Sequence, residues 1–171
     1  MMRSYVQSQK AGLRVGPACL SSILVVLFVT SAVLAQTSKQ PRAIDSILGV
    51  RIGSTFEEAR TKLTPFGTGG GRDTRDGGRK EAWTLKGTEY ANVAFKTDGK
   101  GLVVWVSAFT RRGKEIPFSK LGDLSKAAQV PGTQAVWNIE TPQGGYRLVA
   151  KGANGKASVI YLLSLDFPEI Q

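Results

Sequence analysis

The feature that most constrains the fold of this chain is a pattern of residues that occurs twice along it. The two copies are separated by 56 residues over most of their length and by 54 residues at an upstream tryptophan. A fixed internal period indicates repeated structural units, and units of around 55 residues are marginal alone, so we expect the two to share one core. The matching positions are 90–94 with 146–150, 98–100 with 154–156, Trp105 with Tyr161, and Trp83 with Trp137.

The first copy begins with the clearest helix signal in the chain. Phe56, Ala59 and Leu63 recur at spacings of three and four residues and so form one apolar stripe. Ser54 and Glu57 have the spacing of a capping box, in which each side chain bonds the backbone amide of the other. The sequence therefore predicts a helix of about three turns at most, beginning after Ser54.

The second copy is predicted to open in the same way, and each helix is followed by three strands. The helical stripe of the second copy consists of Phe118, Leu121, Leu124 and Ala128. We therefore predict an α+β fold built from two tandem repeats, each with a helix plus a three-stranded antiparallel sheet. The repeats span about 44–112 and 113–171 and together form a single domain.

A hairpin is predicted within the first copy, with strands at 90–97 and 100–110. The Asp-Gly pair between them is a strong signal for a tight two-residue turn. Pairing across this turn places Phe95 opposite Leu102. It also puts Trp105 on a face that mixes polar groups with aromatic residues.

The second hairpin conflicts with the repeat. Pairing across Asn154 and Gly155 places the more apolar side chains of 146–163 on the face opposite to the one that the alignment of the two copies predicts. Two explanations remain open: a one-residue slip or bulge in this hairpin, or a repeat that is partly chance.

A glycine-rich segment at 66–79 follows the first predicted helix. It holds six glycines, three arginines and two aspartates, a composition typical of a flexible connector. It lacks the spacing of a phosphate-binding loop, and Asp73 and Asp76 supply too few oxygen ligands for a calcium loop. We expect a mobile loop here.

The first 35 residues have the pattern of a secretory signal. Three cations and no acid precede an apolar run from 18 to 35, which ends in small residues before Gln36. We predict cleavage after Ala35 and a flexible leader over 36–43; the alternative is an anchor formed by an uncleaved signal. The protein is then exported to the periplasm or the medium, and we expect no transmembrane segment in its mature chain.

The chemistry available to the chain is narrow, because it contains no histidine and one cysteine, Cys19. This composition excludes Ser–His and Cys–His catalysis and most transition-metal sites. No pair of carboxylates has a convergent pattern, so we predict no cofactor, no metal and no enzymatic activity. The 23 Lys and Arg against 13 Asp and Glu give a formal net charge of +10, which favours salt-sensitive contact with anionic surfaces.

Residues 49–60 (GVRIGSTFEEAR) resemble the opening of small envelope proteins of the SmpA/OmlA type and of the related β-lactamase-inhibitor-protein-like domains. The chain has Ser54 where those proteins usually have Met, and Ala59 where they have Val. The resemblance implies tandem copies of a helix plus three strands. It also implies a binding module that presents its sheet and loops to another protein.

Two functions follow from these observations, and both are forms of binding. The first is contact with an unknown envelope protein through an aromatic face, and the second is binding of an anionic envelope polymer or lipid through basic loops. Both residue sets also have a structural explanation, as core aromatics and solvated loops. Nucleic acid is not expected, because the chain is predicted to be exported and shows no basic helix. The candidate residues are Trp105, Tyr90 and Tyr161 for the first function, and Arg72, Arg75, Arg111 and Arg112 for the second.

Overall fold

The computed structural model describes residues 42–142 and 144–166. The predicted signal peptide, its cleavage site and most of the predicted leader lie outside these residues. Within them, no helix is long and apolar enough to cross a membrane.

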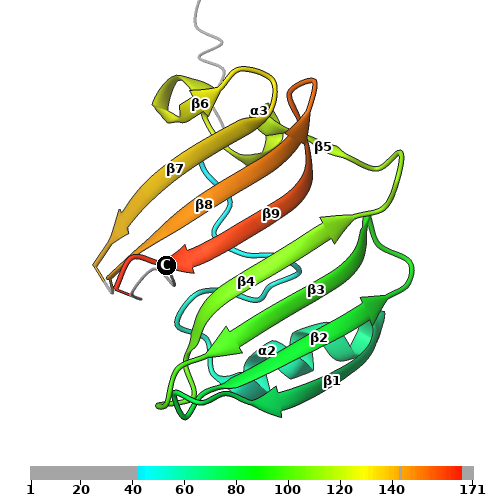
Figure 1. Cartoon of the computed structure of the whole chain (residues 1–171), viewed down its shortest axis with the longest axis vertical. Coiled ribbons are helices and arrows are strands. Elements are labelled where there is room, and N and C mark those ends of the chain that lie inside the picture. Colours follow the sequence, from blue (N-terminus) through cyan, green and yellow to red (C-terminus); the bar gives the residue numbers. More distant parts are fainter. Residues whose placement is uncertain (1–41, 143, 167–171) are drawn as a thin grey trace, which may run out of the picture. The chain divides into compact units, whose positions relative to one another are not determined.

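The described residues form one antiparallel sheet of nine strands (Figure 1). Each half of the chain contributes a meander of four strands, and the two meanders meet where β4 pairs with β9. The short strand β5 (Ile116–Pro117) pairs with the start of β9. The order across the sheet is β1 (Gly67–Asp73), β2 (Arg79–Leu85), β3 (Tyr90–Thr97), β4 (Val103–Thr110), β9 (Lys156–Ser164), β8 (Gly144–Ala153), β7 (Gln134–Thr141) and β6 (Ala128–Val130).

The predicted α+β fold with two helix-plus-three-strand repeats is therefore wrong. The described residues are mostly β, and pairing of β4 with β9 joins the two meanders into one sheet. The helices of the described residues are α2 (Phe56–Leu63), the four-residue α3 (Phe118–Leu121), and the 3-10 turns η3 (Thr64–Phe66) and η4 (Leu124–Lys126).

The predicted second helix ends after about one turn because Gly122 follows α3 in an extended conformation, with φ 177°. A Cβ at Gly122 would lie 2.9 Å from the ring of Trp137, so this glycine lets the indole approach the backbone closely. The chain then turns through η4, and Ala128 begins β6 instead of completing a helical stripe.

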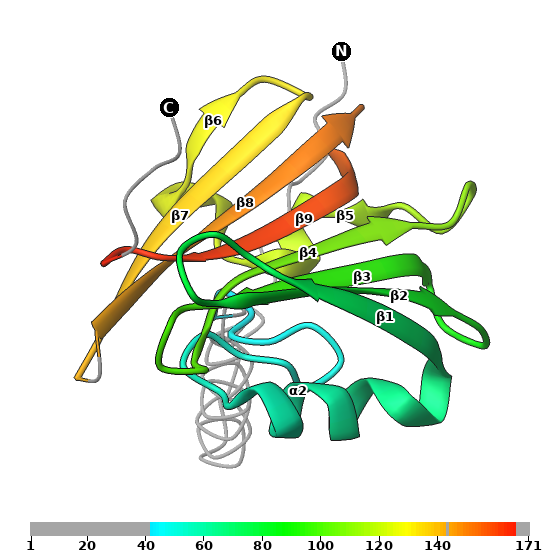
Figure 2. The ribbon, with the colours of Figure 1, turned by 60° about the horizontal axis from the view of Figure 1, so that its bottom comes forward.

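Helix α2 lies across one face of the sheet, which we call the inner face, over the strands of the first half (Figure 2). Its capping box falls one residue later than predicted: Thr55 Oγ1 accepts from the amide of Glu58 at 3.3 Å, and the amide of Thr55 donates to Glu58 Oε2 at 2.8 Å. Ala59 and Leu63 are buried beneath the sheet, as the apolar stripe predicts.

The glycine-rich segment forms strand β1 at the edge of the sheet, not the expected mobile loop. On the inner face, large side chains of β2 lie over its backbone. A Cβ at Gly69 would be 2.3 Å from Cε2 of Trp83, and one at Gly71 would be 2.4 Å from Cγ of Glu81. Glycine is needed in this strand because its neighbour's side chains occupy the space that side chains of β1 would take.

The β3–β4 hairpin has a longer turn than predicted, so its register differs. Asp98 Oδ1 accepts from the amides of Lys100 and Leu102, both at 2.9 Å, and thereby stabilises a loop in place of the two-residue turn. Phe95 consequently faces Val106 instead of Leu102.

A bulge in the β8–β9 hairpin settles the conflict between its two faces. The register shifts between Lys151 and Gly152, which is one of the two explanations that the sequence left open. As a result, Leu148 and Ile160 lie on the inner face and are fully buried, whereas Tyr161 lies on the other face.

The core fills the space between the inner face, α2 and the segment that precedes α2. This segment contributes Ile47 and Val50, and the hydroxyl of Tyr146 donates to the carbonyl oxygen of Ile44 at 3.1 Å. α3 adds Phe118 and Leu121 to the same cluster. Helices α2 and α3 therefore both pack against the inner face.

Candidate functional site

The opposite, outer face of the sheet is not covered by any described helix, and the strand registers show which side chains share it. Residues directly opposite each other on antiparallel strands project from the same face. Trp105 of β4 lies opposite Leu163 of β9, and Ser107 lies opposite Tyr161. Trp105 and Tyr161 are therefore diagonal neighbours on adjacent strands.

Four large apolar side chains gather along β4 and β9 on this face. We call them the outer patch: Trp105, Phe109, Tyr161 and Leu163. Phe109 is 45 % exposed, and the other three are partly exposed. Ala108, which precedes Phe109 in β4, points to the inner face and is fully buried. Strand β4 therefore carries apolar side chains on both faces.

Three cations lie beside the outer patch, in register on adjacent strands. We call them the basic row: Arg72 of β1, Lys80 of β2 and Lys96 of β3. Lys96 lies directly opposite Trp105, so the row leads into the patch. Lys80 Nζ lies 4.9 Å from the centroid of the Trp105 ring, a distance at which a cation is attracted by the face of an indole.

Lys96 forms an ion pair with Asp76 of the β1–β2 turn, with 2.6 Å between Nζ and Oδ2. This hydrogen bond is the main reason that the pKa of Asp76 is lowered to about 2. The side chain of Lys96 is only 15 % exposed, so the pair holds the lysine in place beside Trp105.

The structure brings together some of the residues predicted from the sequence and separates others. Trp105 and Tyr161 lie in the outer patch, and Arg72 begins the basic row. Tyr90, in contrast, belongs to the buried core cluster, and burial raises its pKa to about 12. Arg111 donates to the backbone carbonyl oxygens of Leu85 and Thr88 and so braces the end of the sheet.

Arg75 and Arg112 are exposed in two different loops, between β1 and β2 and between β4 and β5. Sequence reasoning missed four contributors to the outer face: Lys80, Lys96, Phe109 and Leu163. The register across β1–β4 and β9 is the signal that groups them, and it depends on the long turn after β3.

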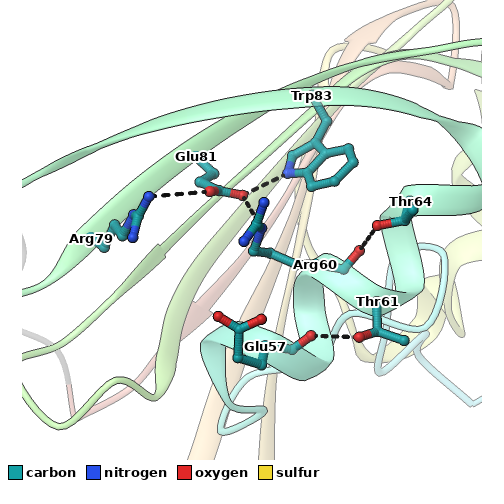
Figure 3. A network of polar contacts seen from close by, with 7 residues as sticks. All are labelled: Glu57, Arg60, Thr61, Thr64, Arg79, Glu81 and Trp83. Carbon is teal, nitrogen blue, oxygen red and sulfur yellow. Dashed lines mark hydrogen bonds and ion pairs between the residues drawn. The ribbon is translucent and has the colours of Figure 1, made fainter.

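A second polar cluster lies on the inner face, around the carboxylate of Glu81 (Figure 3). Glu81 is only 3 % exposed, and its oxygens lie 3.5 Å from Arg60 Nε of α2 and 3.8 Å from Arg79 Nη2. Trp83 Nε1 donates to Glu81 Oε2 at 3.1 Å. These partners satisfy the buried charge and tie α2 to β2, so we assign the cluster to structure.

Hydrogen bonds within α2 hold Arg60 on the helix that presents it to Glu81. The hydroxyl of Thr61 donates to the carbonyl oxygen of Glu57 at 2.9 Å, and that of Thr64 donates to the carbonyl oxygen of Arg60 at 2.8 Å (Figure 3). Arg79 also lies over the ring of Phe56, with 4.7 Å between its guanidinium carbon and the ring centroid.

In residues 42–142 and 144–166, no group of three or more Asp, Glu, Cys or His side chains is placed to hold a metal ion. Comparison with protein-family models, curated proteins and solved structures finds no match. The resemblance of 49–60 to the SmpA/OmlA type stays a prediction.

Proposed function

We propose that the protein is an exported, non-enzymatic binding module of the cell envelope, and that its outer patch binds another protein. The observation that carries this proposal is the gathering of Trp105, Phe109, Tyr161 and Leu163 on a face that no described helix covers. Large aromatic side chains supply much of the binding energy at protein interfaces. Contiguous exposed apolar patches commonly mark interaction sites.

The composition of β4 and β9 supports the proposal. An antiparallel sheet with one face in water normally alternates buried apolar side chains with exposed polar ones. β4 places Val106 and Ala108 in the core, yet its outer positions include Trp105 and Phe109. Apolar side chains on both faces are explained if the outer face is covered by a partner during function.

Binding of an anionic polymer or lipid is the second candidate, and the basic row is the observation that favours it. The four arginines predicted from the sequence to bind such a ligand do not converge on one site, however. Arg111 is engaged with backbone carbonyl oxygens, and Arg112 lies in a separate loop. We therefore rank a protein partner first.

The proposal is tested by affinity capture from an envelope extract on the immobilised protein. Capture is carried out at about 0.05 M and at about 0.5 M salt, because the higher concentration screens exposed charge contacts. The variant Trp105→Ala removes the centre of the outer patch. Val130→Ala is the matched control, since Val130 is a 55 % exposed apolar residue in β6, at the far edge of the sheet.

The proposal predicts a protein that is retained at high salt by the wild type and by Val130→Ala but not by Trp105→Ala. Retention of only lipid or polymer, lost at high salt, would favour the second candidate. Equal capture by all three forms of the protein would contradict a role for the outer patch.

A further inference from the structure

The basic row brings three cations into direct opposition on one face. Arg72 pairs with Lys80 across β1 and β2, and Lys80 pairs with Lys96 across β2 and β3. Like charges directly opposite each other destabilise a sheet. Among the described residues, only Lys96 of this row has a carboxylate partner in an ion pair, Asp76.

The face around the row carries no compensating acid within the strands. The outer positions paired across β1 to β4 hold three cations and no carboxylate. The remaining outer positions of these four strands are small, polar or apolar: Thr68, Gly70, Ala82, Thr84, Asn92, Ala94, Trp105, Ser107 and Phe109. An arrangement that costs stability and lies beside the outer patch is explained if an anionic group neutralises it when a partner binds.

We propose that the partner contributes a short acidic segment of polypeptide, whose carboxylates bind the basic row while an adjoining apolar side chain contacts the outer patch. This inference rests on the proposed function and names the chemistry of its partner. The position of Lys80 over the Trp105 ring joins the two parts of the surface. A carboxylate bound at Lys80 lies at the rim of the patch, as in protein interfaces that have an apolar centre and a charged rim.

The dimensions of the row favour an acidic protein segment over a polyanion. Neighbouring strands are about 4.8 Å apart, so three in-register cations span about 10 Å. Lys96 is already paired with Asp76, so the two cations without a carboxylate partner among the described residues are Arg72 and Lys80, and their spacing matches two carboxylates of one segment. Beyond Lys96 the same row continues through two apolar side chains, Trp105 and Leu163, before it reaches the next cation, Arg147 of β8, which donates to Asn138 Oδ1 at 2.9 Å. An extended polyanion would therefore meet an apolar gap of about 14 Å between Lys96 and Arg147.

Electrostatics of the whole chain act in the same direction. Without the three cations of the predicted signal the formal net charge falls from +10 to +7, and a positive charge of this size attracts acidic partners and accelerates their encounter. We therefore predict that the affinity for the partner decreases as the salt concentration rises, because the contacts of the basic row are screened. The affinity that persists at high salt should depend on the outer patch.

The test measures binding of the predicted mature chain, residues 36–171, to three probes, because the apolar run over 18–35 would by itself bind a vesicle. The first is a fluorescein-labelled peptide, Glu-Glu-Leu-Phe-Glu-Glu; the second replaces each Glu with Gln; the third is a vesicle of phosphatidylglycerol. Fluorescence anisotropy reports peptide affinity, and sedimentation reports vesicle binding. The variants are R72Q/K80Q for the basic row, Trp105→Ala for the outer patch, and Lys120→Gln as a control for loss of charge, because Lys120 is an exposed lysine of α3, which packs on the inner face.

We expect the acidic peptide to bind at least about fivefold more tightly than its Gln counterpart, and R72Q/K80Q to lose at least about fivefold in affinity. Lys120→Gln should stay within about twofold of the wild type. Three results overturn the acidic-segment inference: no binding of the acidic peptide, equal binding of the two peptides, or unchanged affinity in R72Q/K80Q. Stronger retention on the vesicle than on the acidic peptide overturns it too, in favour of a lipid surface.

Failure of the inference and failure of the proposed function are distinguishable. If R72Q/K80Q leaves affinity unchanged and Trp105→Ala abolishes it, the outer patch binds a partner but the acidic chemistry is wrong. If Trp105→Ala has no effect on any probe or on capture from extract, the proposed function itself is wrong.

Discussion

Replacement of Gly69 by alanine tests the packing of Trp83 against the backbone of β1. A Cβ at this position would lie 2.3, 2.4 and 2.6 Å from Cε2, Cδ2 and Nε1 of Trp83, so the indole must move. Trp83 is 4 % exposed, and its Nε1 donates to Glu81 at 3.1 Å. Overpacking and loss of a bond to a charged group together give an expected decrease of about 2–4 kcal/mol in the free energy of unfolding.

Gly70→Ala is the matched control, because it is the next residue of the same strand on the other face. A Cβ at Gly70 would meet no atom within 4 Å, so we expect a change within about 0.5 kcal/mol. Both variants are measured by urea unfolding, followed by far-UV circular dichroism and tryptophan fluorescence. Equal stability of Gly69→Ala and Gly70→Ala would refute the packing of Trp83 over β1.

Three further predictions concern buried charge, pH and exposure. Glu81→Gln should lower the free energy of unfolding by about 1–3 kcal/mol in urea melts, because it leaves two partly exposed arginines without their buried partner; no change would contradict the assignment of the cluster to structure. The pKa of Asp76 is lowered to about 2 from an ordinary 3.8, so the ion pair with Lys96 stabilises the fold above about pH 4 and this stabilisation is lost as the pH falls towards 2. Asp76→Asn should remove this part of the pH dependence of the urea midpoint. Identical pH profiles of the midpoint in the variant and the wild type would contradict the role of the pair. Acrylamide should quench Trp105 preferentially, because Trp83 and Trp137 are 4 % and 3 % exposed; a Trp105→Phe variant that keeps full quenching would show that another tryptophan is accessible.

Local features of the sequence predicted part of the fold. The stripe of Phe56, Ala59 and Leu63 identified α2, because a helix depends on contacts three and four residues apart. Its capping box was predicted one residue early, since Ser54 and Thr55 both precede a Glu at the required spacing. The Asp-Gly pair likewise located the β3–β4 hairpin, although not its register.

Features that depend on distant contacts were not predicted. Glycine composition indicates a loop, and only the side chains of Trp83 and Glu81 across the strand pair explain why glycine forms β1. The register of β3 with β4 depends on how Asp98 bonds the following amides, which an Asp-Gly pair does not specify. Pairing of β4 with β9, which unites the sheet, leaves no local signal in either strand.

The candidate site likewise contains residues that local sequence patterns predict and residues that only distant strand pairing brings together. Trp105 and Tyr161 were selected because aromatic residues with polar neighbours on one strand face are visible in the sequence. Lys80 and Arg72 join them only through the registers of β1, β2 and β3. Tyr90, a candidate for the same aromatic face, lies in the core instead because the register shifts between Tyr90 and Asn92.

The central claim is that the outer patch contacts another protein, and site-specific photo-crosslinking in cells that export the chain tests it most directly. Benzoylphenylalanine is placed at position 109, where the native Phe109 is 45 % exposed in the patch, or at position 130, where Val130 is 55 % exposed at the far edge. The account predicts a discrete crosslinked protein from position 109 that is absent from position 130 and disappears in the Trp105→Ala background. The same adducts from both positions, or an adduct at 109 that persists without Trp105, would contradict it.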